Sequence, residues 1–330
     1  MTFNIFSSNK RAVNLIVKDH VIRYIEIKQQ RSPIVNKFGE RYLPEGVIRE
    51  GKIIDRELLV TILEECIEEW GIKKRPVRFL VPDPYIVIRK IEVPGELTDD
   101  EIRGHLYLEL GASIHLPFEE PAFDVVKVGE KNNQKELLLF AAPEQLVSDY
   151  AGLLEEVKLV PLVADISPLS IYRLYFQLDQ AKTNDHLLVV QADLQMVNIS
   201  IFHEHRPIFM RHLTVDHPIS DWNVAENDSK ESELKWTGNE SELHNQYEDI
   251  YKEIERIMNF YRFSLNQGKE QITTILLSGD HPLLVDILAT MKDRFEVPVV
   301  MIDGEQIITV DGNKLKPTYY LALGLAQKEV

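Results

Sequence analysis

The amino-acid sequence predicts an α/β protein of two lobes, with a smaller α+β subdomain inserted in the first lobe. The chain has 330 residues, which is too long for one compact hydrophobic core. Two β-branched runs joined by a polar turn open the chain at 13–27, and the same arrangement begins again at His186. From Ile86 onward, alternating apolar and polar residues mark the start of the inserted segment.

The first lobe is expected over 11–85 and 161–183. Its opening stretch "VNLIVKDHVIRYIEI" predicts a hairpin with a polar turn at 18–20. Turns rich in Gly and Pro follow, then a helix that ends near Gly71, then the buried strand "PVRFLVP". The helix is predicted by apolar residues at three- and four-residue spacing, which are Leu58, Leu59, Ile62, Leu63, Cys66, Ile67 and Trp70.

The inserted subdomain is expected over 86–160. Its first strand is followed by Thr98 and Glu101, which have the spacing of a capping box at the start of a helix. Two further strands, "FDVVKV" and "ELLLFAA", are joined by a polar turn, and a second helix begins after Pro143. With a last strand, this order is typical of a small α+β module.

The second lobe is expected over 184–215 and 271–330, with a small subdomain over 216–270. Within that subdomain the stretch 221–242 contains seven acidic residues, two lysines and few aliphatic residues. Such a composition predicts a mobile acidic loop. An apolar stripe that begins at Tyr247 predicts a long helix after the loop.

Composition excludes several classes of function. Lys and Arg number 37 and Asp and Glu 53, for a net charge of −16, so phosphate backbones are repelled and no nucleic-acid partner is expected. No run approaches the roughly 18 apolar residues of a membrane span, and the N-terminus lacks the features of a secretion signal. We therefore expect a cytoplasmic protein without direct membrane insertion. The single cysteine, Cys66, lies on an apolar helix face and is expected to be a small buried hydrophobe.

Seven short segments, in the same order, carry a resemblance to a known family. They are "LPEGVIREGKIID", "FLVPDPYIVIRKIEVPGELTDDEIRGHL", "IHLPFEEPAFDVVKV", "RPIFMRHL", "EIERIMNFYR", "LLSG" and "ALGLAQ". On these segments the chain resembles the type IV pilus assembly protein PilM, a relative of FtsA in the actin-like ATPase superfamily. The resemblance implies an actin-like (ribonuclease H-like) fold of two lobes with an FtsA/PilM-type subdomain inserted in the first. It also implies a cytoplasmic protein that a partner recruits to the inner face of the cell membrane.

The same resemblance directs attention to two hairpin turns that hold phosphate in the superfamily, where the pattern is Gly-x-Asp-x-Gly. In "NLIVKDH" the acid position is Ile16 and a glycine position is Lys18. In "VVQADLQ" the acid position is Gln191 and a glycine position is Asp193. An isoleucine offers no oxygen ligand to Mg²⁺, and the carboxylate of Asp193 would repel phosphates.

The nucleoside loop of the superfamily reads Ser-Gly-Gly-Gly, whereas this chain has Ser278 and Gly279 followed by Asp280, His281 and a proline. Three altered turns disfavour ATP hydrolysis, because each metal ligand or phosphate donor contributes orders of magnitude to rate. We therefore expect no enzyme activity and no cofactor, with ATP and Mg²⁺ as the disfavoured alternative. If nucleotide binding survives, Lys18, Gln191, Ser278 and Gly279 are the residues expected to contact it.

Two other clusters contain residue types that could carry chemistry. His203 and His205 lie in a polar hairpin turn, where a solvated turn is favoured over a metal site because no further ligand cluster is near in sequence. Ser278, Asp280 and His281 have the side chains of a hydrolase triad, but one tight loop does not support a relay of successive hydrogen bonds.

A peptide-binding site is better supported than a catalytic one. In the PilM family, the N-terminal cytoplasmic peptide of the membrane protein PilN lies in a cleft between the first lobe and the insert, a form of apolar peptide capture. The resemblance implies that partner-binding residues here include those of an apolar bend and two basic residues in an acidic surround. These residues are Arg89, Arg103, Leu116, Pro117 and Phe118. An alternative remains open, in which Leu116 and Phe118 belong to the core of the insert.

The resulting functional hypothesis is a cytoplasmic scaffold of type IV pilus or DNA-uptake pseudopilus assembly. It binds the N-terminal cytoplasmic tail of a PilN-like inner-membrane protein and contacts other pilus assembly proteins. One alternative is a pilus assembly protein that binds ATP and hydrolyses it weakly. A more distant alternative is a small-molecule kinase of the same superfamily, which lacks a catalytic acid at Ile16 and Gln191. The sequence leaves self-association open.

Overall fold

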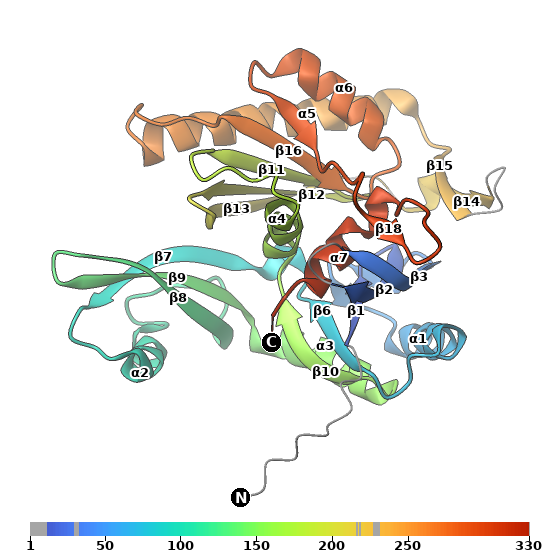
Figure 1. Ribbon diagram of the computed structural model, residues 1–330, viewed down its shortest axis with the longest axis horizontal. Helices are drawn as coiled ribbons and strands as arrows, with labels where there is room; N and C mark the ends of the chain where they lie inside the picture. Colours follow the sequence, from blue (N-terminus) through green and yellow to red (C-terminus); the bar gives the residue numbers. More distant parts are fainter. Residues whose placement is uncertain (1–11, 30–32, 216, 218, 227–231, 330) are drawn as a thin grey trace, which may run out of the picture. The chain divides into compact units, whose positions relative to one another are not determined.

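The computed structural model describes residues 12–29, 33–215, 217, 219–226 and 232–329 (Figure 1). The chain divides into two compact units, and each is described by itself. Unit 1 consists of Met1–Leu80, Tyr150–Leu178 and Asp303–Val330, and unit 2 of Val81–Asp149 and Asp179–Ile302. Both units combine sheets with helices, as the sequence predicts for an α/β protein.

Unit 1 contains a six-stranded sheet with the order β10-β6-β1-β2-β3-β18. The predicted opening hairpin is confirmed, because β1 and β2 pair antiparallel, while β6 lies parallel to both β1 and β10. The strands are β1 (Val13–Val17), β2 (Val21–Gln29), β3 (Ile34–Tyr42), β6 (Pro76–Leu80), β10 (Val160–Asp165) and β18 (Ile308–Thr309). A short pair, β4 (Ile48–Arg49) with β5 (Lys52–Ile53), follows β3.

The helix predicted before Gly71 is α1 (Arg56–Trp70). Its first turn is capped by Asp55, whose side chain accepts a hydrogen bond from Leu58 N–H, and its end is closed by Gly71 in the left-handed conformation at φ 66°. Cys66 is buried on the inner face of α1, as predicted. Burial raises the pKa of the Cys66 thiol to about 11, which keeps it a protonated apolar group at neutral pH.

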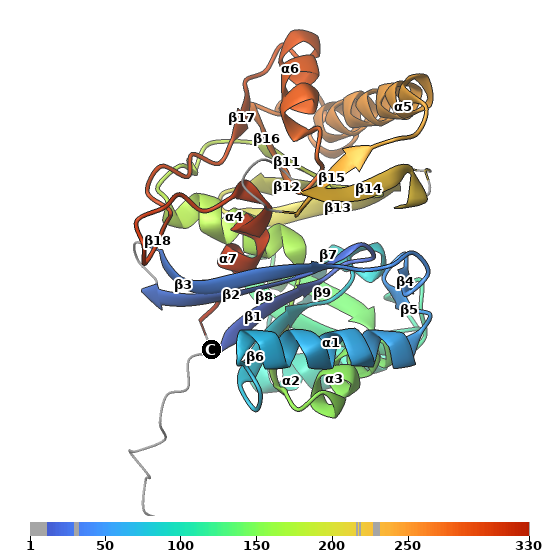
Figure 2. The same ribbon diagram turned by 90° about the vertical axis from the view of Figure 1, so that its right-hand side faces the viewer.

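Helices cover both faces of the first sheet. Figure 2 shows α1 with α3 (Glu144–Glu156) along one face, where Arg56 and Glu156 form an ion pair at 2.9 Å. The other face carries α7 (Tyr320–Ala326), which packs on α4 (Ser167–Gln177) and contacts β1 and β2. The two helices approach so closely that a Cβ on Gly324 would lie 1.9 Å from the carbonyl oxygen of Ser170.

The C-terminal segment belongs to unit 1. The expected division put 271–330 in the second lobe, whereas the structure groups residues from Asp303 onward with the first sheet. The reason is a parallel pairing of β18 with β3 and the burial of every residue of α7. Neither contact has a local sequence signal, because both join segments that lie far apart along the chain.

Unit 2 contains a five-stranded sheet with the order β13-β12-β11-β16-β17. As predicted, its opening repeats a hairpin, β11 with β12, whereas β16 lies parallel to β11 and β17 parallel to β16. The strands are β11 (Leu187–Ala192), β12 (Met196–His203), β13 (Arg206–Thr214), β16 (Thr274–Gly279) and β17 (Val299–Met301). Helix α6 (Leu284–Arg294) follows β16 and contacts it.

The insert forms a second, three-stranded sheet within unit 2, with the order β7-β9-β8 and helix α2 packed against it. The predicted polar turn between β8 and β9 is present, with Asn132 and Asn133 at φ 52° and 62°. The predicted capping box at Thr98 and Glu101 is also present at the start of α2. The elements are β7 (Val87–Pro94), α2 (Asp99–Glu109), β8 (Pro121–Lys131) and β9 (Gln134–Pro143).

The last part of the segment 86–160, in which the insert is expected, groups with unit 1. Helix α3 crosses the boundary between the two units, and residues from Tyr150 onward group with unit 1. Strand β10 explains this grouping, because it extends the first sheet by pairing parallel with β6. The hydroxyl of Tyr150 is also buried in unit 1, where it donates to Gly51 O at 3.0 Å.

The expected mobile loop at 221–242 is wrong over the described residues. Strands β14 (Trp222–Glu226) and β15 (Ser232–Trp236) pair as a hairpin, and α5 (Glu240–Asn259) begins shortly afterwards. The two rings of the Trp222–Trp236 pair lie 5.0 Å apart, so aromatic cross-strand packing stabilises a hairpin that has few aliphatic residues. Residues 227–231, part of the predicted loop, lie outside the described residues.

Within the described ranges, none of the helices is both long and apolar enough to cross a membrane.

The close contact between α4 and α7 gives a test of packing in unit 1. We expect Gly324→Ala to lower the free energy of unfolding by about 1–3 kcal/mol or more, because the new methyl group would overlap the backbone of Ser170. The control is Gly104→Ala on α2, where a Cβ meets no atom within 4 Å and helix propensity predicts a gain of about 0.5–1 kcal/mol. Urea denaturation followed by circular dichroism measures both, and equal effects of the two variants would contradict the packing argument.

Candidate functional site

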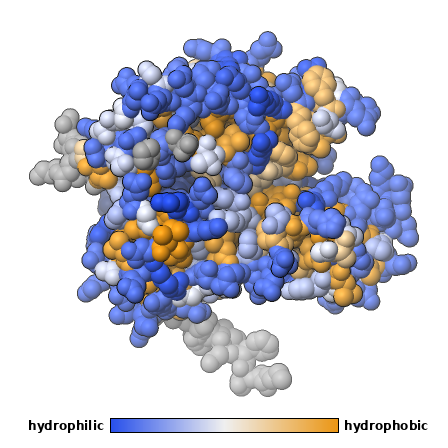
Figure 3. Space-filling model, turned by 180° about the vertical axis from the view of Figure 1, so that it is seen from behind, coloured by the Kyte–Doolittle hydropathy of each residue, from blue (hydrophilic) through white to orange (hydrophobic). Residues whose placement is uncertain are grey.

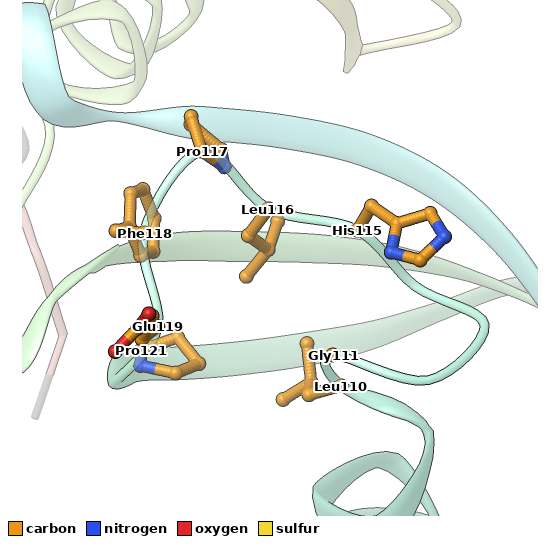
Figure 4. Close-up of a pocket in the computed structure, with 8 residues that line it drawn as sticks. All are labelled: Leu110, Gly111, His115, Leu116, Pro117, Phe118, Glu119 and Pro121. Atoms are coloured by element: carbon orange, nitrogen blue, oxygen red, sulfur yellow. The ribbon is translucent and has the colours of Figure 1, made fainter.

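A pocket of about 400 Å³ lies within the insert, between the end of α2 and the start of β8 (Figure 4). Figure 4 shows Leu116 and Leu110 pointing toward one another, while the ring of His115 points away. The residues that line the pocket are Leu110, Gly111, His115, Leu116, Pro117, Phe118, Glu119 and Pro121. Three residues predicted from the sequence, Leu116, Pro117 and Phe118, are therefore brought together.

The backbone after α2 builds this pocket through a tight turn. Gly111 has φ 85°, a left-handed conformation that favours glycine, and its N–H donates to Ile114 O at 3.1 Å. The N–H of Ile114 in turn donates to Glu109 O at 2.9 Å. The turn ends α2 and sends the following segment back across the sheet of the insert.

Leu116 and Phe118 have two roles. Both are half-buried and pack against the core of the insert, together with Leu110 and Ile114. The same side chains line the pocket. The alternative in which Leu116 and Phe118 pack against the core of the insert is therefore present, and a contact of the same side chains with a partner peptide stays a prediction.

The two predicted basic residues do not line the pocket. The guanidinium of Arg89 donates to His115 O at 2.7 Å and holds the loop above β7. The guanidinium of Arg103 donates to Phe123 O at 3.0 Å and lies over the Phe123 ring at 5.6 Å. Both arginines therefore hydrogen-bond to the backbone of the insert, and their contact with a partner stays a prediction.

An exposed apolar surface on α2 was not predicted. Tyr107 is 64% exposed and Leu108 is 78% exposed, which is unusual for large apolar side chains next to a pocket. Figure 3 shows orange apolar side chains gathered over the insert, at the right of that view. The sequence signal was the run "LYLEL", which places apolar residues on more than one face of the helix.

Acidic side chains surround this apolar surface. Glu109 lies at the end of α2 and accepts a hydrogen bond from Ser113 Oγ. Glu119 lines the pocket and Glu120 follows it, both exposed. The combination of apolar walls with an acidic rim favours a ligand that carries apolar anchors and a positive charge.

In unit 1, the turn between β1 and β2 is hydrogen-bonded to the turn between β4 and β5. The carboxylate of Asp19 accepts backbone N–H groups from Glu50 at 2.5 Å and from Gly51 at 2.9 Å. Burial raises the pKa of Asp19, against the opposing effect of these two hydrogen bonds. Ile16, at the acid position of the superfamily pattern, is buried with 3% of its surface exposed. Lys18, half-buried in the same turn, donates its backbone N–H to Val21 O at 2.9 Å.

In unit 2, the other two turns are joined to each other. Asp193 accepts from Gln191 Nε2 at 2.7 Å and from the backbone N–H of Asp280 at 3.3 Å. Gln191 pairs with Ser278 across β11 and β16, so Gln191, Ser278 and Gly279 are brought together. Lys18 belongs to the other unit.

Gly279 is required by packing. It has φ 126°, and a Cβ at this position would lie 1.9 Å from Ala192 O. The backbone N–H of His281 donates to the same carbonyl at 3.1 Å. The one glycine retained from the Ser-Gly-Gly-Gly pattern therefore lets the loop after β16 pass against β11.

Aromatic rings enclose the loop after β16. The His281 ring lies 5.2 Å from the ring of Trp222 on β14 and 5.2 Å from the ring of Tyr247 on α5. Burial raises the pKa of Tyr247 well above its usual range. His281 Nδ1 accepts the backbone N–H of Leu283 at 3.1 Å, so this nitrogen serves a local turn.

His203 has a packing contact. Its ring stacks on His186, with centroids 4.0 Å apart and an interplanar angle of 8°. Glu204 and His205 form the turn that follows, at φ 48° and 62°. Within the described part of the chain, no group of three or more His, Cys, Asp or Glu side chains is placed to hold a metal ion.

These sheets and the order of their strands define a protein of actin-like fold. A solved PilM-PilN type IV pilus biogenesis complex contains a chain 18% identical to this one, with a TM-score of 0.75, over 96% of this chain and 97% of that chain. The chain belongs to the family of the type IV pilus assembly protein PilM, whose model matches residues 16–330.

Two further solved structures are more distant. The ethanolamine utilization protein EutJ from Carboxydothermus hydrogenoformans is 10% identical, with a TM-score of 0.48, over 96% of this chain and 89% of that chain. MreB5 of Spiroplasma citri bound to ADP is 8% identical, with a TM-score of 0.46, over 96% of this chain and 95% of that chain.

The stacked histidines predict a pH dependence of stability. His186 contacts Tyr261 Oη through Nδ1 at 2.6 Å and Glu270 Oε2 through Nε2 at 3.0 Å. Burial, and then His203, lower the pKa of His186, against the opposing effect of Glu270. The unfolded chain takes up this proton near pH 6.5, whereas the folded protein does so only at lower pH. The contribution of neutral His186 to the free energy of unfolding is therefore complete above about pH 6.5. It is lost as the pH falls through the pKa of His186 in the folded protein.

We expect His186→Gln to lose less of its free energy of unfolding than the wild type between about pH 7 and pH 5, the window below the unfolded pKa. Urea denaturation at a series of pH values measures the difference. The control is His244→Gln, an exposed position on α5, for which the profile should follow the wild type. Parallel profiles for the wild type and His186→Gln would show that His186 does not couple stability to pH.

Proposed function

We propose that this chain is a cytoplasmic scaffold of a type IV pilus or DNA-uptake pseudopilus. It binds the N-terminal tail of a PilN-like inner-membrane protein, which recruits it to the membrane, and it works without ATP hydrolysis. The observation that carries the proposal is the apolar pocket of the insert formed by Leu110, Leu116 and Phe118. Family membership and the solved PilM-PilN complex support a PilN-like partner.

The pocket is suited to a short peptide. Its volume of about 400 Å³ accommodates one or two apolar side chains, and each that becomes fully buried contributes about 1.5–3 kcal/mol. Exposed Tyr107 and Leu108 on α2 extend the apolar surface beyond the pocket. The exposed acids Glu119 and Glu120 favour a tail that carries a Lys or Arg beside its apolar residues.

The state of the three turns supports a scaffold that does not hydrolyse ATP. Ile16 is buried and has no oxygen ligand for a metal ion. Asp193 uses its carboxylate to bind Gln191 and the backbone of Asp280 within unit 2. These side chains stabilise the turns themselves, and no group at the acid positions can position Mg²⁺ and a water molecule.

Substitutions in the pocket should weaken binding of the tail. Leu116→Ser and Phe118→Ser are each expected to raise the Kd for a synthetic N-terminal peptide of the PilN-like partner by about tenfold to a hundredfold, because each removes an apolar contact. Fluorescence anisotropy measures the Kd, and circular dichroism checks the fold because both residues also touch the core. The control is Val285→Ser on α6, a position 73% exposed, which should bind like the wild type. Absence of binding by well-folded wild-type protein would overturn the proposal.

Nucleotide should have little effect on the protein. Because a ligand stabilises the native state that binds it, we expect millimolar Mg-ATP to change the Tm by less than about 1 °C. Differential scanning fluorimetry with ATP, ADP and a magnesium-only control measures this change. A rise of several degrees with Mg-ATP would instead support the alternative of an ATP-binding assembly protein.

A further inference from the structure

An exposed apolar surface lies in unit 2 where α5 passes into a π-helical turn, Phe260–Leu265. Phe260 is 41% exposed, Phe263 is 58% exposed and Leu265 is 48% exposed. Three large apolar side chains within six residues are more than the scattered single positions that ordinary surfaces show. We call the surface formed by these three residues, together with Arg256, Arg262 and Lys269, the aromatic-basic surface.

The turn holds these side chains outward through one buried residue. Tyr261 is buried, and its hydroxyl lies 2.6 Å from His186 Nδ1 at the start of β11. The carbonyl oxygen of Tyr261 accepts from Asn266 Nδ2 at 3.0 Å. A π-helical turn replaces the α-helical ladder here, a feature that is rare and often marks functional sites. The exposed rings are thus presented by a turn that is fixed to the sheet.

A stretch with basic and without acidic residues lies in this surface, between Glu255 and Glu270. The stretch 256–269 contains Arg256, Arg262 and Lys269 and neither Asp nor Glu, in a chain with a net charge of −16. The guanidinium of Arg262 lies over the Phe263 ring at 5.0 Å, so an apolar and a basic group are presented together. All three cations are exposed.

Strand β13 extends the same surface. The rings of Phe209 on β13 and Phe260 lie 5.7 Å apart. Arg211 on β13 forms an ion pair with Glu253 at 2.7 Å, and Glu253 also pairs with Arg256 at 3.1 Å. Glu270, the acid that follows the basic stretch, pairs with His186. Glu253 is therefore engaged with two arginines, and Glu270 contacts His186, whose pKa is lowered.

We propose that the aromatic-basic surface makes a peripheral contact with an anionic phospholipid bilayer. Phe and Leu side chains on a projecting turn enter the headgroup region, while Arg262 and Lys269 meet lipid phosphates. The contact does not span the membrane. Because the remaining surface of a chain with a net charge of −16 is repelled by anionic lipid, this surface also sets the orientation of unit 2 at the membrane.

Strand β13, which borders the aromatic-basic surface, also contacts the insert. Arg206 at the start of β13 donates to Val128 O of β8 at 2.7 Å, and β13 also contacts β7. A tail bound at the pocket and a lipid contact at the aromatic-basic surface would thus act on one compact unit, which raises the effective concentration of the second contact. This coupling rests on the proposed function, whereas the lipid contact itself does not.

The test uses the full chain and two kinds of vesicle, one of phosphatidylethanolamine with phosphatidylglycerol and one of phosphatidylcholine alone. We expect cosedimentation with the anionic vesicles that weakens as salt is raised, and little with the neutral ones. Phe263→Ser should weaken binding by about tenfold or more. Arg262→Gln and Lys269→Gln should each weaken it by about fivefold, and Val285→Ser, 73% exposed on α6, should bind like the wild type.

Three results would overturn this proposal. The first is absence of binding of the wild type to anionic vesicles. The second is binding of the Phe263 and Arg262 variants that equals that of the wild type. The third is that light scattering shows a wild-type dimer which these variants lose while they keep vesicle binding, a result that would assign the surface to a second copy. Titration of Phe263→Ser with the partner peptide keeps this proposal separate from the proposed function. Unchanged peptide affinity with lost vesicle binding supports the lipid contact alone.

Discussion

The contact between Gly279 and the backbone of Ala192 constrains how the loop after β16 passes against β11 in unit 2. Only a residue without a Cβ lets β16 end against β11 at this distance, and the next residues then bond to Asp193 and to Ala192 O. His281 is thereby placed between rings from β14 and from α5. The loop after β16 is thus in contact with both the β14–β15 hairpin and helix α5.

The parts of the fold that the sequence predicted are those with local signals. The hairpin at 13–27, the capped helix before Gly71 and the Asn132-Asn133 turn each follow from neighbouring residues. The hairpin at Trp222 and Trp236 was missed, because a pair of rings across two strands stabilises it where an acidic composition indicates a loop. The return of β18 to the first sheet was missed for a similar reason, since its partner β3 lies at the other end of the chain.

For the candidate site, apolar identity was predictable and side-chain direction was not. Leu116, Pro117 and Phe118 interrupt a helical pattern, and they line a pocket within the insert, whereas the resemblance implied a cleft between the first lobe and the insert. The hydrogen bonds of Arg89 and Arg103 to backbone carbonyls of the insert could not be predicted. A sequence shows that a cation is present, whereas the nearest unsatisfied carbonyl depends on how the loop crosses the sheet.

Unit 1 is assembled from three separated segments of the chain, with the insert and the second sheet between them. Its six-stranded sheet is complete only when β18 at Ile308–Thr309 joins β3. The hairpins of unit 2, in contrast, pair strands that are close neighbours in sequence. During synthesis on the ribosome, much of unit 2 can therefore fold before the last strand and helix of unit 1 have been made. A chain truncated at its C-terminus would accordingly lose the first sheet before the second.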